Sequence, residues 1–288
     1  MLNNRFIQQY TTIPICIYKS GILNFQTRVP APLSNHKDFE IVYIKSGSAM
    51  YTVNDSKAVA HEGSMIFLSP YMVHTLDSLP DIDLEYLCLC FDSSLILNKA
   101  LVADLENNRF FIKIHIEPDS VHYNTLINLF NEIYSSTETA KPFWEMNVMG
   151  NLNLMFAYLM QNNLYLKASQ PSSTTVFSKN VINYIEEHYH EYITSHSIAD
   201  DMHYHQSYFC RLFKKVFGLC FNEYLCLLRL EKAKVLLINS PDTSVTDIAF
   251  EAGFSNLSYF SKKFREQYKI SPNQFRQNNA GDTIRKNS

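Results

Sequence analysis

Two hydrophobic patterns divide the chain. Between about residues 20 and 115, apolar positions occur in short runs separated by turn residues, whereas further on they recur every three or four positions. Short runs are typical of β-strands, and the longer period is typical of amphipathic helices. The sequence therefore predicts an α+β, multidomain chain with a β-rich N-terminal part and an all-α C-terminal part.

Four short runs are predicted to be strands: Phe39–Lys45, Ala49–Val53, Met65–Leu68 and Leu84–Phe91. Turn residues follow three of them, at Ser46-Gly47, Asn54-Asp55 and Ser69-Pro70. Closely spaced short strands indicate a sandwich or a barrel. We therefore expect a small barrel over about residues 20–115.

Two amphipathic helices are expected after the barrel, over Val121–Ser135 and Phe143–Leu164. The second helix places apolar residues at four-three-four spacing, at Val148, Leu152, Met155 and Leu159. This seam predicts either pairing with a second copy of the chain, as in a coiled coil, or packing on the barrel of the same chain. The spacing does not separate the two alternatives.

The helical C-terminal part contains an internal repeat. One copy has Ile198-Ala199, a turn and then Tyr208–Lys215, and the other has Ile248-Ala249, a turn one residue longer and then Tyr259–Glu266. Each copy is a short helix, a tight turn and a longer helix, which is the pattern of a helix-turn-helix. A single long helix, Asn222–Asn239, is predicted between the two copies.

The turns carry the residues that such a geometry requires. In the second copy, Gly253 occupies the position that needs a positive φ, and Asn256 can cap the next helix. The first copy has His203 and Tyr204 in the turn and His205 as the cap, and histidine tolerates the left-handed region better than most residues.

The longer helix of each copy has an apolar face and a polar face. We predict that Phe209, Leu212, Phe213 and Val216 point inward in the first copy, as do Phe260, Phe264 and Tyr268 in the second. Outward residues near a helix start are those that reach base edges in the major groove. The predicted DNA-binding residues of the recognition helices, 206–217 and 257–268, are Gln206, Ser207, Cys210, Arg211, Lys214, Lys215, Asn256, Leu257, Ser258, Ser261, Lys262 and Arg265.

These side chains suit different parts of a DNA duplex. Arg211 can form a paired hydrogen bond with guanine, whereas Lys214, Lys215, Lys263 and Arg265 are better placed for phosphates. Neighbouring turns of the major groove lie about 34 Å apart, so one chain with a rigid spacer helix could read two of them.

Net charge supports DNA binding only weakly. The chain carries a formal charge of −3, with 11 basic and 16 acidic residues before position 175 and 14 basic and 12 acidic residues after it. The sign of the C-terminal part is right for nucleic acid, but the excess is small. The prediction therefore depends on where the charges lie.

Residues 182–276 resemble the DNA-binding domain of the AraC/XylS family of bacterial transcription regulators, over about a third of the chain. The motifs that carry the resemblance are Ile198-Ala199, Leu212–Lys215 with Gly218, Arg229-Leu230, Ile248-Ala249, Gly253-Phe254, Tyr259-Phe260 and Ser271-Pro272 with Phe275-Arg276. His205, Cys210 and Asn222 depart from the family pattern. The resemblance implies a homodimeric regulator that binds double-stranded DNA and RNA polymerase.

The N-terminal part is similar to a cupin-like sensor barrel, through Phe39–Gly47 and Gly63–His74. The resemblance implies a small-molecule effector, with a sugar among the candidates. We expect its binding residues to be His36, Glu40, Tyr43, Tyr51, His74 and Tyr86. Enzymatic cupins hold a metal at four positions, of which His36, Glu40 and His74 match three and Ser34 occupies the fourth. We expect a ligand pocket there and no metal or other cofactor.

The chain has 6 cysteines without a CxxC pair, which indicates reduced thiols. Cys88 and Cys90 would share one face of a strand. Two interpretations remain open for them: a metal or redox role, and simple packing in the core. No apolar run is long enough to cross a bilayer, and Met1–Tyr10 has no signal-like core, so we expect a cytoplasmic protein.

Together these observations predict a ligand-sensing and dimerisation domain over residues 1–166, with helices at about 119–165. A polar linker over 167–178, a DNA-binding domain over 179–280 and a disordered tail over 281–288 follow. The predicted function is sequence-specific transcription regulation controlled by an effector, without enzymatic activity. Two alternatives remain open: a metal-binding cupin enzyme tethered to DNA, and a regulator controlled by a protein partner.

Overall fold

The structure is a computed structural model that describes residues 13–19, 36–53, 56–107, 109–112, 115–167 and 173–278. The chain divides into a β-rich unit within residues 11–179 and a helical unit that begins at residue 180. Ser34, the turn at Asn54-Asp55, most of the predicted linker and the tail from residue 281 lie outside the described residues. Within those residues, no helix combines the length and the apolar character that a membrane span requires.

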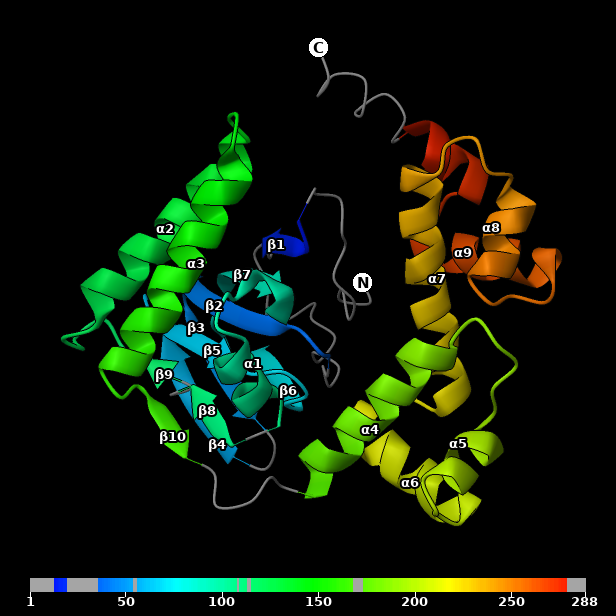
Figure 1. Cartoon of the computed structure of the whole chain (residues 1–288), viewed down its shortest axis with the longest axis horizontal. Helices are drawn as coiled ribbons and strands as arrows, with labels where there is room; N and C mark the ends of the chain where they lie inside the picture. The colour runs from blue at the N-terminus through cyan, green and yellow to red at the C-terminus, as the bar shows by residue number, and fades with distance from the viewer. Residues whose placement is uncertain are drawn as a thin grey trace. The chain divides into compact units, whose positions relative to one another are not determined.

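The β-rich unit contains two facing antiparallel sheets and a separate antiparallel pair of short strands (Figure 1). The first sheet has the order β1 (Ile15–Lys19), β7 (Glu85–Phe91), β2 (Phe39–Ser46), β5 (Met65–Leu68) and β9 (His115–Ile116). The second has the order β4 (Ser56–His61), β3 (Ser48–Val53) and β6 (His74–Ser78), and β10 (Tyr165–Lys167) pairs with β8 (Phe110–Ile112). All four predicted strands are confirmed.

The two faces of the first sheet bury different sets of side chains, as the alternation of a strand requires. From β2, Val42 and Ile44 point between the sheets, where they pack with side chains of β3 and β5. Phe39 and Ile41 point to the other face and join a separate core formed with two helices. The barrel interior is therefore distinct from the layer that the helices cover.

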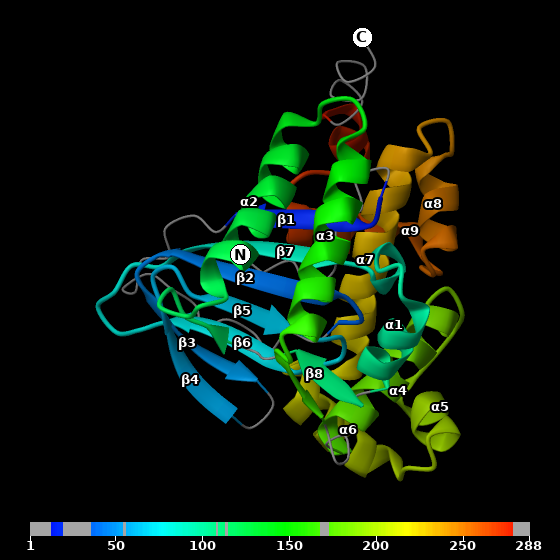
Figure 2. The same cartoon turned by 60° about the vertical axis from the view of Figure 1, so that its left-hand side comes forward.

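Helices α2 (Tyr123–Thr139) and α3 (Trp144–Gln161) lie across that outer sheet face, as Figure 2 shows, and α1 (Lys99–Glu106) follows β7 after a single 3₁₀ turn, Ser93–Leu95. The four residues of the apolar seam on α3 are completely buried in this core. Packing on the barrel of the same chain is thus confirmed for the seam, and a second copy would have to use another face of α3.

Helix α4 (Ser173–His188) crosses the boundary at residue 180. The helical unit continues with α5 (Ser195–Asp201), α6 (Gln206–Phe217), α7 (Phe221–Asn239), α8 (Val245–Glu251), α9 (Leu257–Tyr268) and a last helix over 272–278. Helix α7 carries the α5–α6 pair near one end and the α8–α9 pair near the other (Figure 1). Both helix-turn-helix copies and the spacer helix between them are therefore confirmed.

Helix α4 begins inside the segment predicted to be a linker. Its first turns contain Thr175 and Ser178, which are both buried although their polar composition is typical of a loop. The prediction of a linker that reaches residue 178 was therefore wrong at its C-terminal end.

The two helix-turn-helix turns have the same hydrogen bonds. The amide of Tyr204 donates to the carbonyl of Ala199 at 2.8 Å, and the amide of Phe254 donates to that of Ala249 at 2.9 Å. The left-handed position is His203 in one copy (φ +57°) and Gly253 in the other (φ +89°), as predicted. Duplicated backbone geometry thus holds the two longer helices in equivalent ways.

Candidate nucleic-acid interface and barrel site

The longer helices α6 and α9 correspond residue by residue, with each position of α6 matched 51 positions later in α9. Each begins at a predicted cap: the His205 ring accepts from the Ser207 amide, and the Asn256 side chain accepts from the Tyr259 amide at 2.8 Å. Each ends at a left-handed residue, Gly218 or Lys269. The sequence therefore builds two recognition helices of the same length and phase.

Both helices bury their phenylalanines and expose the predicted reading residues. Phe209 and Phe213 in α6 and Phe260 and Phe264 in α9 are inaccessible to solvent. The predicted DNA-binding residues of both copies are exposed, except that Ser261 is only half-buried. Leu212 was predicted to be a core residue, but it is half-buried because it lies at the edge of the apolar face.

The basic side chains on the exposed stripes are available to a partner. Within the part of the chain that the structure describes, no ion pair involves Arg211, Lys214, Lys262 or Arg265. By contrast, Lys263, which was expected to contact phosphates, pairs with Glu266 at 2.8 Å on another side of α9 and does not join the stripe. Four unpaired cations on two equivalent helices are suited to phosphates and guanine edges.

Sequence reasoning missed a pair of equivalent aromatic residues next to the stripes. Tyr208 and Tyr259 are 48% and 49% exposed, at matching positions of α6 and α9. The signal was present in the repeat itself, because an exposed tyrosine that recurs in both copies is not needed for either core.

The turn of the second copy is tied to the rest of the helical unit by Arg229 of α7. Its Nε donates to the carbonyl of Tyr189 at 2.7 Å, and its Nη2 donates to the carbonyl of Glu191 at 2.6 Å. Gly253 lies against this pair, and a Cβ there would come within 2.4 Å of the Tyr189 oxygen and 2.7 Å of Nε. Glycine is therefore required at this turn for space as well as for its positive φ.

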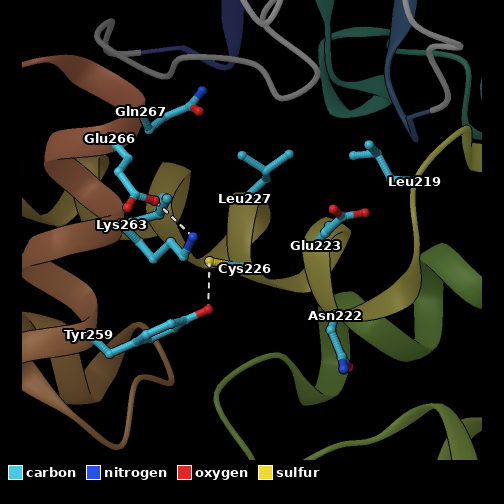
Figure 3. Close-up of a pocket in the computed structure, with 10 residues that line it drawn as sticks. Leu219, Asn222, Glu223, Cys226, Leu227, Tyr259, Lys263, Glu266 and Gln267 are labelled. Atoms are coloured by element: carbon cyan, nitrogen blue, oxygen red, sulfur yellow. Dashed lines mark hydrogen bonds and ion pairs between the residues drawn. The ribbon is translucent and has the colours of Figure 1, made fainter.

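A pocket of about 490 Å³ lies between α7 and α9 (Figure 3). Tyr259, Lys263 and Glu266 line it from α9, and Glu223 and Cys226 line it from α7. The residues from α9 lie on a side of the helix other than the reading stripe. This face would therefore remain accessible while the stripe lies in a DNA groove.

In the β-rich unit, polar side chains gather at one end of the barrel interior. Nε2 of His36 and Nε2 of His74 lie 2.9 and 3.0 Å from the same oxygen of Glu40. The Cys88 thiol donates to the other oxygen at 3.0 Å, and its sulfur lies 3.3 Å from that of Cys90. Register explains the gathering, because Glu40 is the cross-strand partner of Cys90.

Burial and close contacts shift the pKa values of this cluster. Burial alone would raise the pKa of Glu40, but the charge of His74 and hydrogen bonds from both imidazoles hold that pKa well below its usual range. Burial acts to lower the pKa of His36, yet its contacts with Glu40 outweigh burial and raise it. The cluster therefore favours an ionised carboxylate beside a protonated His36.

The pKa values of the two thiols are raised, whereas the pKa of a reactive cysteine is lowered. The hydrogen bond with Cys90, together with burial, raises the pKa of Cys88 well above its usual value. The hydrogen bond from Cys88 acts to lower the pKa of Cys90, but burial and the charge of Glu40 raise it to about 12. Since the thiolate is the nucleophile, neither thiol is activated for redox or acyl chemistry at neutral pH.

Two of the predicted tyrosines face the same interior, and one does not. Tyr51 and Tyr86 are buried between the sheets, and the Tyr51 hydroxyl lies 3.3 Å from Nδ1 of His115. Tyr43 points to the outer face, where its ring packs 5.8 Å from that of Phe130 in α2. Placing Tyr43 with the ligand-binding residues was wrong, because it is an odd number of positions from Glu40 on the same strand.

Comparison with known proteins accounts for both units. The family described as "AraC-like ligand binding domain" matches residues 26–149, and the family described as "Helix-turn-helix domain" matches residues 198–278. The chain belongs to the AraC/XylS family of transcription regulators. It is a DNA-binding transcription regulator with a ligand-binding domain, as the resemblance implied.

Relatives share this organisation over nearly their whole length. The regulator is 24% identical to the HTH-type transcriptional regulator YdeC of Bacillus subtilis over 273 residues, or 93% of each chain. It is 25% identical to the HTH-type transcriptional activator RhaS of Escherichia fergusonii over 257 residues, covering 84% of this chain and 87% of RhaS. These relatives are named as regulators of transcription.

Among solved structures, that of ToxT from Vibrio cholerae with a bound unsaturated fatty acid is similar to the regulator. The TM-score is 0.51 at 14% identity, and the match covers 91% of this chain and 95% of ToxT. At this identity the likeness concerns the fold alone, which is a β-rich domain followed by a helical domain.

Proposed function

We propose that α6 and α9 enter adjacent major grooves of an operator and read its sequence through their exposed stripes. The observation that carries the proposal is the duplication of one stripe, with unpaired Arg211 and Lys214 on α6 and Lys262 and Arg265 on α9. The intervening α7 has 19 residues, or about 28 Å of rigid helix, which suits a spacing of about 34 Å between grooves.

The test uses DNA that the wild-type chain selects from a random-sequence pool, since such selection identifies the preferred operator sequence directly. In fluorescence anisotropy, Arg211→Ala should weaken binding by about 1–3 kcal/mol and relax discrimination at one base pair. Unchanged affinity and unchanged base preference would remove Arg211 from its role.

Two adjacent lysines provide a matched pair. Lys262 lies on the reading stripe, whereas Lys263 faces the pocket and pairs with Glu266. Lys262→Ala should weaken binding to all sequences and lower the slope of log affinity against log salt by about 1. Lys263→Ala is the control and should leave the slope nearly unchanged; equal slopes for the two variants would contradict the assignment.

The effector is proposed to bind within the barrel, at His36, Glu40, Tyr51, His74 and Tyr86. The interior combines apolar walls, including Val42, Ile44 and Leu68, with polar groups at both ends. This favours a small amphiphile over a sugar, because a polyol would leave many hydroxyls against apolar walls. ToxT, which has a similar fold, binds an unsaturated fatty acid, and a fatty acid is a small amphiphile of the kind proposed for this barrel.

A thermal-shift comparison of the full chain separates these classes. Fatty acids should raise the melting temperature of the β-rich unit and sugars should not, because only a ligand that binds the native state stabilises it. A shift with sugars alone would reverse the assignment. We propose that the ligand is bound and released unchanged, without enzymatic turnover, and ligand recovered after prolonged incubation should be chemically intact.

A homodimer is proposed through the exposed face of α3, since the seam is buried. Met146 and Leu154 are 71% and 60% exposed, and Gly150 between them has nothing within 4 Å of where a Cβ would stand. These positions, spaced by four residues, form one stripe on which a second copy could pack. Leu154→Arg should yield a monomer in sedimentation velocity, whereas Leu97→Arg, at a 70% exposed leucine outside the helix, should not.

We propose that the regulator acts in the cytoplasm and contacts RNA polymerase while it is bound to DNA. The pocket-lining side of α9, with Tyr259 and Glu266, is the candidate contact because it lies off the reading stripe. Glu266→Ala should reduce transcription in a purified system more than it reduces DNA binding. Equal losses in both assays would place the residue in DNA binding instead.

A further inference from the structure

Another pocket of the helical unit brings two exposed thiols together, between α6 and the start of α7. Its volume is about 370 Å³, and it is lined by Cys210, Arg211 and Lys214 from α6 and by Cys220, the residue that caps α7. All six cysteines lie within the residues that the structure describes, and Cys210 and Cys220 are the two that are exposed. A reagent in solution can therefore reach both thiols at one place.

The α6 side of this pocket is positively charged. Arg211 and Lys214 are exposed, and within the described part of the chain neither takes part in an ion pair. Lys214 follows Cys210 by four residues and so lies on the same side of the helix. Cations attract an anionic reagent, and an arginine can hold a carboxylate by two parallel hydrogen bonds. Reactive cysteines typically combine solvent access with a neighbouring lysine or arginine.

The two thiols of the pocket have different surroundings. A hydrogen bond from the Cys220 side chain is the largest cause that lowers the pKa of Glu223, and the Cys220 amide donates to the same carboxylate at 3.1 Å. Cys220 therefore has a partner for its thiol and a negative charge beside it. Among the described residues, no hydrogen bond or ion pair engages the Cys210 thiol. An anionic reagent would thus meet cations and a free thiol at Cys210.

The second recognition helix shows that the stripe does not need this thiol. The residue of α9 that matches Cys210 is Ser261, while Lys262 and Arg265 match the two cations of the pocket. A serine hydroxyl can donate and accept hydrogen bonds at such a position, but it cannot form a disulfide. Cys210 therefore adds a covalent chemistry that the equivalent stripe of α9 lacks.

We propose that this pocket is a modification site at which Cys210 forms a mixed disulfide with an anionic, low-molecular-weight disulfide such as oxidised glutathione. The Cys210 thiol releases its proton to solvent, and its sulfur attacks one sulfur of the reagent. The disulfide bond of the reagent breaks as the new bond forms. The other half of the reagent leaves as a thiolate and takes a proton from solvent, so the reagent is itself the oxidant.

The modification has a direct consequence for DNA binding. Cys210 lies on the exposed stripe of α6, so the adduct adds bulk and negative charge where the helix would meet phosphates and base edges. This consequence rests on the proposed reading role of α6, whereas the reaction at Cys210 does not depend on DNA.

Reaction with dithiobis(nitrobenzoic acid) tests the site, because this anionic disulfide releases a coloured thiolate. The reduced, full-length chain is freed of reductant and mixed with the reagent, and the adduct is located by peptide mass spectrometry. Cys220→Ser reports Cys210, and serine keeps the cap of α7; Cys210→Ser reports Cys220. We expect Cys210 to react about 10-fold faster than Cys220. Equal rates, or an adduct that forms on Cys220 first, would overturn the proposal.

Charge variants test the role of the cations. Arg211→Gln combined with Lys214→Gln should slow the reaction of Cys210 about 10-fold, the lower end of what a charged cleft contributes to association. The uncharged dipyridyl disulfide should react with this variant as fast as with the wild type. Lys262→Gln combined with Arg265→Gln removes the same charge from the matching positions of α9 and is the control, which should react like the wild type. Equal slowing by both double variants would refute a local charge effect.

Anisotropy on the selected DNA completes the test. Oxidised glutathione should weaken binding by the wild type about 10-fold or more, dithiothreitol should restore it, and Cys210→Ser should bind equally before and after treatment. A chain that binds the selected DNA but whose Cys210 reacts no faster than Cys220 refutes the modification site and leaves the proposed function intact. A Cys210 adduct that leaves the affinity for DNA unchanged refutes the reading role of α6 and not the site.

Discussion

Replacing Gly253 by alanine tests how the second helix-turn-helix is held. The new Cβ would meet the Tyr189 carbonyl at 2.4 Å and the Arg229 Nε at 2.7 Å, both shorter than real contacts allow. The left-handed backbone itself costs a non-glycine residue about 1–2 kcal/mol. Displacing Arg229 also weakens two charge-assisted hydrogen bonds, each worth about 1.5–3 kcal/mol. We therefore expect Gly253→Ala to lower the free energy of unfolding of the helical unit by about 3–5 kcal/mol.

The single tryptophan allows the two units to be followed separately. Trp144 lies in α3, so its fluorescence reports the β-rich unit, whereas far-ultraviolet circular dichroism reports both units. Gly253→Ala should lower the melting temperature of the transition that Trp144 does not report, by on the order of 15 °C or more. The fluorescence transition should stay where it is.

Gly150→Ala is the matched control. Gly150 lies on the exposed side of α3, where an added Cβ meets nothing within 4 Å. Measured at chain concentrations low enough to keep the chain monomeric, alanine should therefore stabilise the β-rich unit by about 0.5–1 kcal/mol through helix propensity alone. If Gly253→Ala cost less than about 1 kcal/mol, or shifted the Trp144 transition instead, the close-approach argument would be refuted.

Three further substitutions test the fold and the interface. His203→Gly should stabilise the helical unit by up to about 1 kcal/mol in circular-dichroism melts, because His203 has φ +57°; a loss of stability would mean that its side chain matters more than its backbone. Leu152→Ala should lower the free energy of unfolding of the β-rich unit by about 2–5 kcal/mol, as followed by Trp144 fluorescence, because Leu152 is fully buried. A much smaller loss would contradict the packing of the seam on the barrel. Lys215→Ala should lower the salt slope of DNA binding by about 1 at every operator sequence, and a sequence-dependent effect would indicate a base contact.

The parts of the fold that were predictable are those with a strong local period. The run Met65–Leu68 became β5 without change, and the predicted helix Asn222–Asn239 became α7 with one added residue. The repeat supplied both recognition helices because the same spacing of phenylalanines occurs twice. In contrast, strand β1 at Ile15–Lys19 lies outside the predicted barrel. Its five residues are too few to show a clear hydrophobic period, and no turn residues marked its start.

Tertiary packing determines the features that the hydrophobic periodicity of the sequence alone does not. The seam of α3 suits a coiled coil and a sheet equally well, and only the apolar outer face of β2 and β7 determines its partner. Tyr43 was assigned to the pocket from its residue type, although counting from Glu40 along the strand already excludes it. Counting residues along β2 and β7 also predicts that Cys90 lies opposite Glu40, but only once the register of the two strands is known.

The bonds from Arg229 to Tyr189 and Glu191 also link the residues just after α4 to the turn of the second copy rather than to that of the first. Helix α4 is the first element after the segment that joins the two units. A displacement of its C-terminal end along α7 would strain those two bonds and tilt α9, while α6 has no equivalent arginine contact among the described residues. The two recognition helices, although duplicated in sequence, are therefore anchored to their surroundings by different contacts.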